Sequence, residues 1–98
     1  MPRQRSRAAA PSGRRLSPEH VALGRAIRDL REGIGISQET LADRSGLHRT
    51  YVGGIERGER NLSYGNLLKV ASALKVSPSQ LLSHAEYGRG TGRRPPTR

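Results

Sequence analysis

The sequence predicts an all-α protein, a compact domain of five short helices with a basic segment at each end. Three observations predict this fold class. Apolar residues recur at spacings of three and four, serines that suit helix starts precede these runs, and glycines follow several of them. No segment alternates polar and apolar residues over the length of a strand. At 98 residues the chain suits one such domain, which we place at residues 17–84.

The first two predicted helices are each bounded by a serine and a glycine. Ser17 is followed by proline at the first helical position and then by an acidic residue, which is typical of a helix start. Gly33 and Gly35 end this helix. Ser37 caps the second helix, which stops at Gly46. The residues expected to face the core are Leu23, Ile27 and Leu30 in the first helix and Leu41 and Ala42 in the second.

The third predicted helix, which Gly58 ends, contains an irregularity. Gly53 and Gly54 stand side by side in its middle. Each glycine costs a helix interior about 0.5–1 kcal/mol relative to alanine. The glycines are therefore either merely tolerated or needed where the helix meets a partner.

The last two predicted helices have clearer starts. Ser63 begins the fourth helix. Ser77 begins the fifth, with Gln80 three residues on, which is a capping-box pattern. The expected core residues are Leu67, Val70, Ala71 and Leu74 in the fourth helix and Leu81 and Leu82 in the fifth.

Positive charge is concentrated at the two ends of the chain. The net charge is +10, which indicates a polyanionic partner, either nucleic acid or an anionic membrane surface. Residues 1–16 and 85–98 are rich in arginine, proline and glycine and poor in large apolar residues, so we expect a disordered basic arm and a disordered basic tail. They either solubilise the protein or lie along phosphates.

The composition also excludes several classes of protein. No run of about 20 apolar residues suits a membrane span, and the basic start lacks the apolar run of a secretory signal. The three histidines lie in separate helices, cysteine is absent, and no phosphate-binding glycine loop occurs. We therefore expect no enzyme, metal, cofactor, membrane or small-molecule substrate, and a cytoplasmic protein associated with the nucleoid.

The second and third predicted helices form a unit that indicates DNA binding. The segment "SQETLADRSGLHRTYVGGIERG" predicts a short helix, a turn containing Gly46, and another short helix, the layout in which the second helix enters the major groove. A helical wheel places Glu56 inward with the core residues and Gly54 on the opposite face. A buried carboxylate needs a partner. Arg49, at the start of the helix, suits bidentate contact with guanine.

These residues also carry a resemblance. The segments "LGRAIRDLRE", "ISQETLADRSGL", "YVGGIERGERN" and "LLKVASALKVSPSQLL" resemble the phage-repressor-type (XRE-like, lambda-repressor-like) helix-turn-helix family. The segment "LHRTYVGGIERGERN" resembles the corresponding segment of the controller proteins of restriction–modification systems. The resemblance implies that Gln38 contacts the DNA backbone and braces the recognition helix. It also implies base contacts by Arg49, Thr50 and Gly54, and an ion pair between Arg31 and Glu56.

Further residues are expected to contact the DNA backbone. Tyr51 packs either on the sugar–phosphate backbone or in the helix interface, and Arg44 either holds a phosphate or lies in solvent. His48 stands where the family often has a serine or threonine cap. The full set expected at the backbone is Ser37, Gln38, His48, Tyr51, Arg57, Arg60 and Asn61.

The function predicted is a sequence-specific transcriptional regulator that binds palindromic operator DNA as a homodimer. A domain this small reads few base pairs, so two copies on a double-stranded palindrome are expected. The dimer interface is placed at Val76, Leu81 and Leu82. Two alternatives remain, an antitoxin-type interaction module with autoregulatory DNA binding, and a non-specific nucleic-acid binder acting through its arginine-rich tails.

Overall fold

The computed structural model of the protein describes residues 14–88. In this part of the chain there are five helices and no strands. The helices are α1 (Pro18–Gly33), α2 (Gln38–Ser45), α3 (Arg49–Glu56), α4 (Tyr64–Ala73) and α5 (Pro78–Gly88).

The helix starts follow the predicted capping chemistry, except at α3. Ser17, Ser37 and Ser63 each accept a hydrogen bond at Oγ from the backbone N–H three residues later. Ser77 and Gln80 exchange the reciprocal hydrogen bonds of a capping box, at 2.7 and 3.0 Å. His48, at the start of α3, makes no capping hydrogen bond with its side chain.

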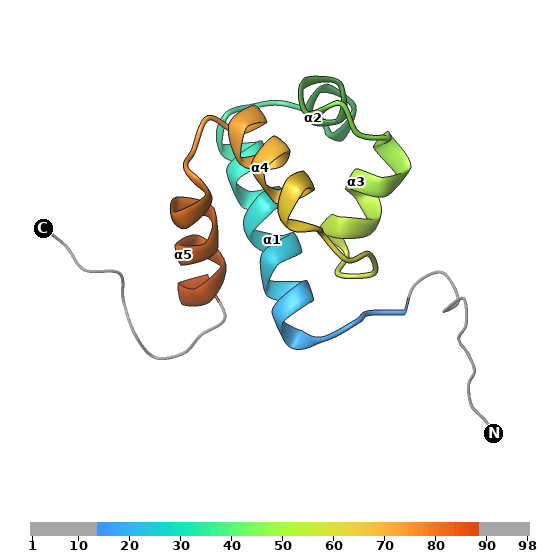
Figure 1. Cartoon of the computed structure of the whole chain (residues 1–98), viewed down its shortest axis with the longest axis vertical. Coiled ribbons are helices and arrows are strands. Elements are labelled where there is room, and N and C mark those ends of the chain that lie inside the picture. The colour runs from blue at the N-terminus through green and yellow to red at the C-terminus, as the bar shows by residue number, and fades with distance from the viewer. Residues whose placement is uncertain (1–13, 89–98) are drawn as a thin grey trace, which may run out of the picture.

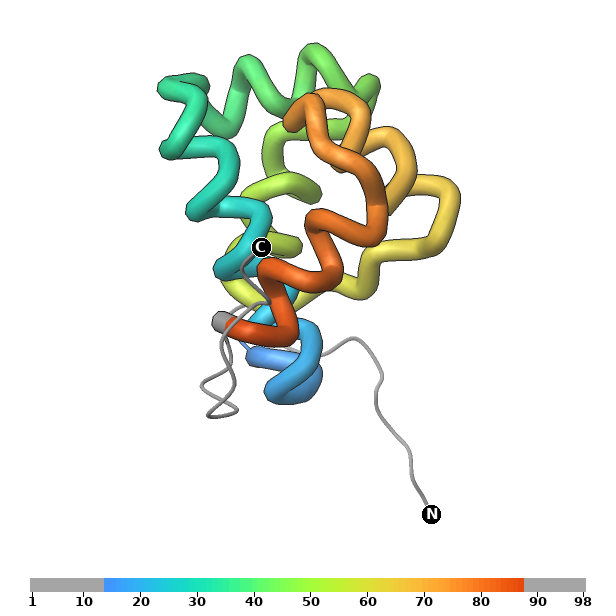
Figure 2. Tube along the Cα trace, turned by 90° about the vertical axis from the view of Figure 1, so that its left-hand side faces the viewer, coloured from blue at the N-terminus to red at the C-terminus, as the bar shows by residue number. Residues whose placement is uncertain are grey.

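The helices are arranged around α1, as Figure 1 shows. Helix α5 packs along one side of α1 and α3 packs on another, whereas α2 contacts α3 and α4. In the view of Figure 2, α5 lies at the front of the molecule. The largest fully buried side chains come from all five helices or their ends, so one core holds the domain together. They are Ile27, Leu41, Val52, Val70, Leu74 and Leu81.

Helices α1 and α3 touch through their backbones at Gly24. A Cβ atom placed there would overlap the carbonyl oxygen of Ile55 and lie 2.7 Å from that of Glu56. Only a residue without a side chain fits this crossing. Gly58, just after α3, has a positive φ of 77° and lies against Val21 of α1. Two glycines thus fix how closely α3 approaches α1.

Both expected domain boundaries fall close to structural elements. Helix α5 continues to Gly88, four residues past the boundary expected at 84, because Ala85 is buried against the core and extends the apolar face. At the other end, the backbone N–H of Leu16 donates to the carbonyl oxygen of Gly58 at 2.8 Å. The rest of the expected arm, residues 1–13, and of the expected tail, residues 89–98, lies outside the described residues.

The residues expected at a dimer interface differ in exposure. Leu81 is fully buried in the core, so the expectation that it contacts a second copy is wrong. It faces inward because α5 turns this position toward α1 and α4. Val76 is half-buried, and Leu82 is 47% exposed. Of the three residues, Leu82 is the one that offers most of its side chain to a partner.

Candidate nucleic-acid interface

Helices α2 and α3 are joined by a tight turn. Gly46 takes a positive φ of 74°, and the next N–H, that of Leu47, donates to the carbonyl oxygen of Ala42 at 3.0 Å. This is the left-handed helix ending that glycine adopts without steric cost. The turn brings the start of α3 to the surface while Val52 and Ile55 remain in the core.

The inner side of α3 is held by a buried polar cluster. Nε and an outer nitrogen of Arg31 donate to the two carboxylate oxygens of Glu56 at 2.7 and 3.0 Å. Nε2 of Gln38 donates to the same carboxylate at 2.9 Å. Arg31 also donates to the carbonyl oxygen of Ile36 at 2.9 Å. One carboxylate therefore ties the end of α3 to α1 and to the start of α2.

This cluster keeps Arg31 charged. The hydrogen bond and the negative charge of Glu56 raise the pKa of the Arg31 guanidinium above its ordinary value, against the opposing effect of burial. The side chain of Glu56 is 3% exposed and that of Arg31 11% exposed. An ion pair of this kind is a rigid brace, since each charge would be costly to bury alone.

The start of α3 is open to solvent. His48, Arg49 and Thr50 are all exposed, and α3 lacks an acidic residue in its first turn. The unpaired N–H groups of a helix start attract negative charge. Arg49 and Thr50, the residues predicted to read bases, therefore stand exposed at a positive helix end.

The paired glycines are buried, which the helical wheel did not predict for Gly54. A Cβ atom at Gly54 would overlap Cγ of Arg60, so the stem of that arginine covers the glycine. At Gly53 a Cβ atom would lie 3.1 Å from a guanidinium nitrogen of Arg57 and 3.5 Å from Oε1 of Gln38. The wheel places Gly54 on the face opposite the core, but in this arrangement the side chain of Arg60 covers it. The contact of Gly54 with bases stays a prediction that requires Arg60 to move.

A second polar chain anchors the loop after α3. The hydroxyl of Tyr51 donates to the carbonyl oxygen of Asn61 at 2.7 Å and accepts from Nδ2 of Asn66 at 3.2 Å. Nε2 of His20 lies 3.1 Å from Oδ1 of Asn61, and its Nδ1 lies 2.6 Å from Oγ of Ser17. For Tyr51 these contacts favour the helix-interface role over packing on the DNA backbone. The roles of His20 and Asn66 have no local sequence signal.

The other residues expected at the DNA backbone lie around α3. Ser37 uses its hydroxyl to cap α2 and to contact Oγ1 of Thr40 at 3.1 Å. Arg57 and Arg60 are exposed, and Nε of Arg57 pairs with Glu59 at 3.1 Å. Ser37 stands at the start of α2 and the two arginines follow α3, and all three are exposed, so their DNA contacts remain predictions.

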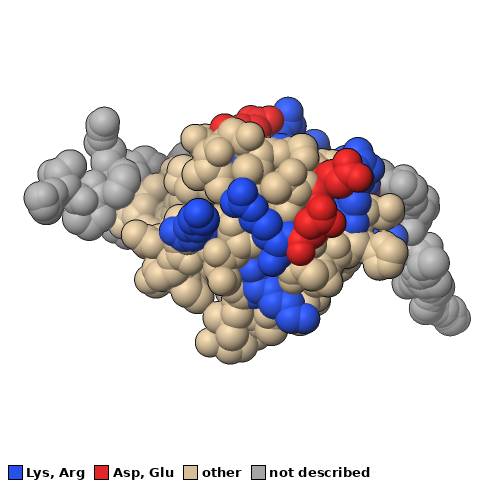
Figure 3. Space-filling view, turned by 90° about the horizontal axis from the view of Figure 1, so that it is seen from above, with Lys and Arg blue, Asp and Glu red and all other residues tan. Residues whose placement is uncertain are grey.

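The charge on the end of the molecule that bears α2 is mixed. Figure 3 shows lysine and arginine side chains in a band across this face, with acidic side chains beside it. Among residues 14–88 no cluster of three or more histidine or acidic residues suits a metal ion. None of the helices in the described part of the chain is long and apolar enough to cross a membrane.

A short helix pair braced by a buried ion pair, with an exposed positive helix start, defines a helix-turn-helix protein of the DNA-binding type. The chain belongs to the helix-turn-helix family, whose model matches residues 27–81. It is 44% identical to control protein C.BamHI of Bacillus amyloliquefaciens, over 69% of this chain and 85% of that protein. It is 46% identical to control protein C.SmaI of Serratia marcescens, over 62% of this chain and 73% of that protein.

Solved structures agree with this membership. The restriction–modification controller protein C.AhdI from Aeromonas hydrophila has 52% identity and a TM-score of 0.65, covering 66% of this chain and 98% of that one. The controller protein C.Esp1396I, solved as a tetramer with its natural 35-base-pair operator, has 32% identity and a TM-score of 0.72. That alignment covers 78% of this chain and all of the other.

Proposed function

We propose that the protein is a transcriptional regulator that binds palindromic operator DNA sequence-specifically, with α3 in the major groove. The observation that carries this proposal is the exposed start of α3, with Arg49 and Thr50, on a helix that the Arg31–Glu56 pair holds from behind. Rigid support matters because a bidentate contact to a base requires the arginine to approach at a set angle.

The relatives support a narrower version of the proposal. Control and controller proteins of restriction–modification systems are similar to this chain over most of their length, and one of them was solved on its operator. We infer that this protein acts in the same way, in the cytoplasm on DNA and without a catalytic role. The genes it controls are then those of a restriction–modification system.

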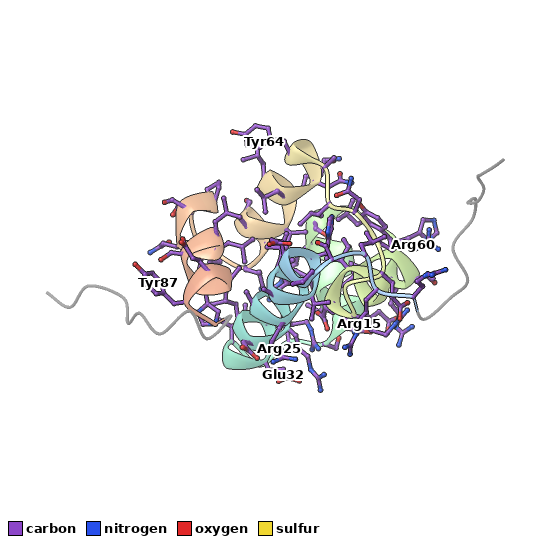
Figure 4. All side chains as sticks on the ribbon, turned by 90° about the horizontal axis from the view of Figure 1, so that it is seen from below. Arg15, Arg25, Glu32, Arg60, Tyr64 and Tyr87 are labelled. Atoms are coloured by element: carbon purple, nitrogen blue, oxygen red, sulfur yellow. The ribbon has the colours of Figure 1, made fainter. Side chains whose placement is uncertain are left out.

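A homodimer is part of this proposal. One eight-residue recognition helix reaches only a few base pairs, so two copies on a palindrome supply the needed specificity. Apolar side chains that a second copy would cover are exposed on α4 and α5. They are Tyr64 at 74%, Leu68 at 38% and Leu82 at 47% exposed. Tyr64 lies on the opposite side of the molecule from Arg15 and Arg25 (Figure 4).

The test is selection of binding sites from random double-stranded DNA by the full-length protein, followed by competition. We expect a palindromic consensus sequence. The protein should bind this sequence more tightly than random DNA by a factor on the order of 10³ or more. Equal loss of binding on all sequences would contradict the proposal and would favour a non-specific binder led by the arginine-rich ends. Sedimentation with and without the selected duplex measures whether the protein forms a dimer.

A further inference from the structure

A small hollow lined by arginines lies between α1, the segment before it, and the end of α3. It has a volume of about 140 Å³. Four of its six lining residues are arginines, and its other two are Val21 and the braced Glu56. The arginines are Arg15, Arg25, Arg28 and Arg57.

The positive charge of this hollow is only partly compensated. Arg28 pairs with Glu32 at 3.2 Å and Arg57 pairs with Glu59 at 3.1 Å. The side chains of Arg15 and Arg25 form no ion pair or hydrogen bond with another residue among 14–88. The carboxylate of Glu56 is already hydrogen-bonded to Arg31. Two guanidinium groups are therefore free to bind an anion, next to two that are weakly held at the surface.

The chain holds Arg15 at this place. The neighbouring residue, Leu16, is bound through its backbone N–H to Gly58, directly after α3. Figure 4 shows Arg15 and Arg25 along the same edge of the molecule, beside α1 and α3. The start of the described chain is thus attached to the recognition unit, and it adds an arginine to the flank of that unit.

The hollow also adjoins the end of α3, the helix proposed to enter the groove. Arg57 lines the hollow, and its guanidinium reaches across Gly53 beside Gln38. Helix α3 has eight residues and is about 12 Å long, close to the roughly 12 Å width of the major groove. When the start of α3 meets the bases, groups at its other end stand near the rim of the groove, where the phosphates lie.

We propose that Arg15, Arg25, Arg28 and Arg57 form a binding site for a phosphate group, and that this phosphate belongs to the DNA backbone at the rim of the groove entered by α3. Guanidinium groups bind phosphate oxygens through two parallel hydrogen bonds, which suits a converging set of arginines. The site positions the protein and reads no base. The inference rests on the proposed function for its choice of DNA as the source of the phosphate.

The experiment compares Arg25→Gln with Lys69→Gln in the full-length protein. Both variants lose one positive charge from an exposed helical position, but Lys69 lies on α4 and does not line the hollow. The salt dependence of binding is measured on the selected operator and on a duplex of arbitrary sequence. We expect Arg25→Gln to reduce the salt slope by about one unit per protomer, hence about two per dimer, with the preferred sequence unchanged.

Two results would overturn the proposal. The first is a salt slope and affinity of Arg25→Gln equal to those of Lys69→Gln, with thermal unfolding showing both variants folded. The second is a combination of two observations. Inorganic phosphate binds saturably at sub-millimolar concentration, as shown by shifts of the backbone amide NMR signals of α1, and Arg25→Gln leaves the salt slope of DNA binding unchanged. This result would identify a small-anion site instead. If the wild-type protein has no preferred sequence, the proposed function is refuted. The salt slope of Arg25→Gln on the duplex of arbitrary sequence would still test whether these arginines bind phosphate.

Discussion

Gly24 of α1 lies directly against the backbone carbonyl of Glu56 in α3, so the two helices cross with no side chain between them. The same glutamate binds Arg31 of α1 through its side chain. The recognition helix is therefore attached to α1 twice at nearly one point, once by backbone packing and once by an ion pair. This double attachment sets the position of α3 relative to the rest of the domain.

Replacing Gly24 by alanine is expected to destabilise the protein by about 1–3 kcal/mol, because the added methyl group meets backbone atoms that move only if the helices separate. Thermal or urea unfolding measures the change. Gly33→Ala is the matched control, since a Cβ atom there has open space. The control should be neutral or slightly stabilising, in line with helix propensity. Equal stability of the two variants would contradict the close crossing.

Replacing Glu56 by alanine is expected to cost about 3–5 kcal/mol of unfolding free energy, since it leaves the Arg31 guanidinium buried without its partner. Glu56 raises the pKa of Arg31, so the contribution that Arg31 makes through this pair is fully present at neutral pH and is lost as the pH rises through that alkaline pKa. Glu32→Gln is the control because it removes only the exposed pair with Arg28 and a longer contact of 3.9 Å with Arg31, and exposed pairs are worth about 0–1 kcal/mol. A melting temperature unchanged in Glu56→Ala would disprove the brace.

Replacing Arg49 by alanine is expected to relax sequence preference at one base position in each half-site, at a cost of about 1–3 kcal/mol per contact. Binding to the operator and to single-base variants of it gives the measurement. Arg44 is exposed on α2, and Arg44→Ala removes the same charge, so it should weaken binding to all sequences equally or not at all. If Arg49→Ala behaves like Arg44→Ala, then Arg49 reads no base.

Replacing Gly54 by glutamate is expected to abolish operator binding without unfolding the domain. The new side chain displaces Arg60, a flexible residue that can move, and puts a negative charge on the recognition helix. Circular dichroism reports the fold and a gel-shift assay the binding. Gly54→Ala displaces the same arginine without adding charge and should retain most of the binding. Full binding by Gly54→Glu would show that this side of α3 does not face the DNA.

Replacing Leu82 by glutamate is expected to weaken the dimer while the protomer stays folded, because this side chain is exposed on α5. Sedimentation equilibrium gives the dimer constant. Ser83→Glu places the same charge on the neighbouring exposed position as a control. Leu81→Ala should instead lower the stability of the protomer by about 2–5 kcal/mol, since Leu81 is fully buried. An unchanged dimer constant in Leu82→Glu would remove α5 from the interface.

Much of the fold could be predicted because its signals are local. The serines that begin α1, α2, α4 and α5 and the glycines that follow α1, α2 and α3 act through hydrogen bonds within a few residues. The pair between Arg31 and Glu56 was also predictable, although its members lie on different helices. An acidic residue on an inward helical face requires a basic partner, and the family resemblance indicated which one.

The sequence by itself thus determined the order of the helices, the helix-turn-helix unit and the residues at its exposed start. Tertiary structure alone decided that Gly54 lies under Arg60, that Leu81 rather than Leu82 enters the core, and that four arginines from distant segments line one hollow. The physical reason is the same in each case. Periodicity defines the faces of one helix, but the neighbour that covers a face is set by how all the helices pack around α1.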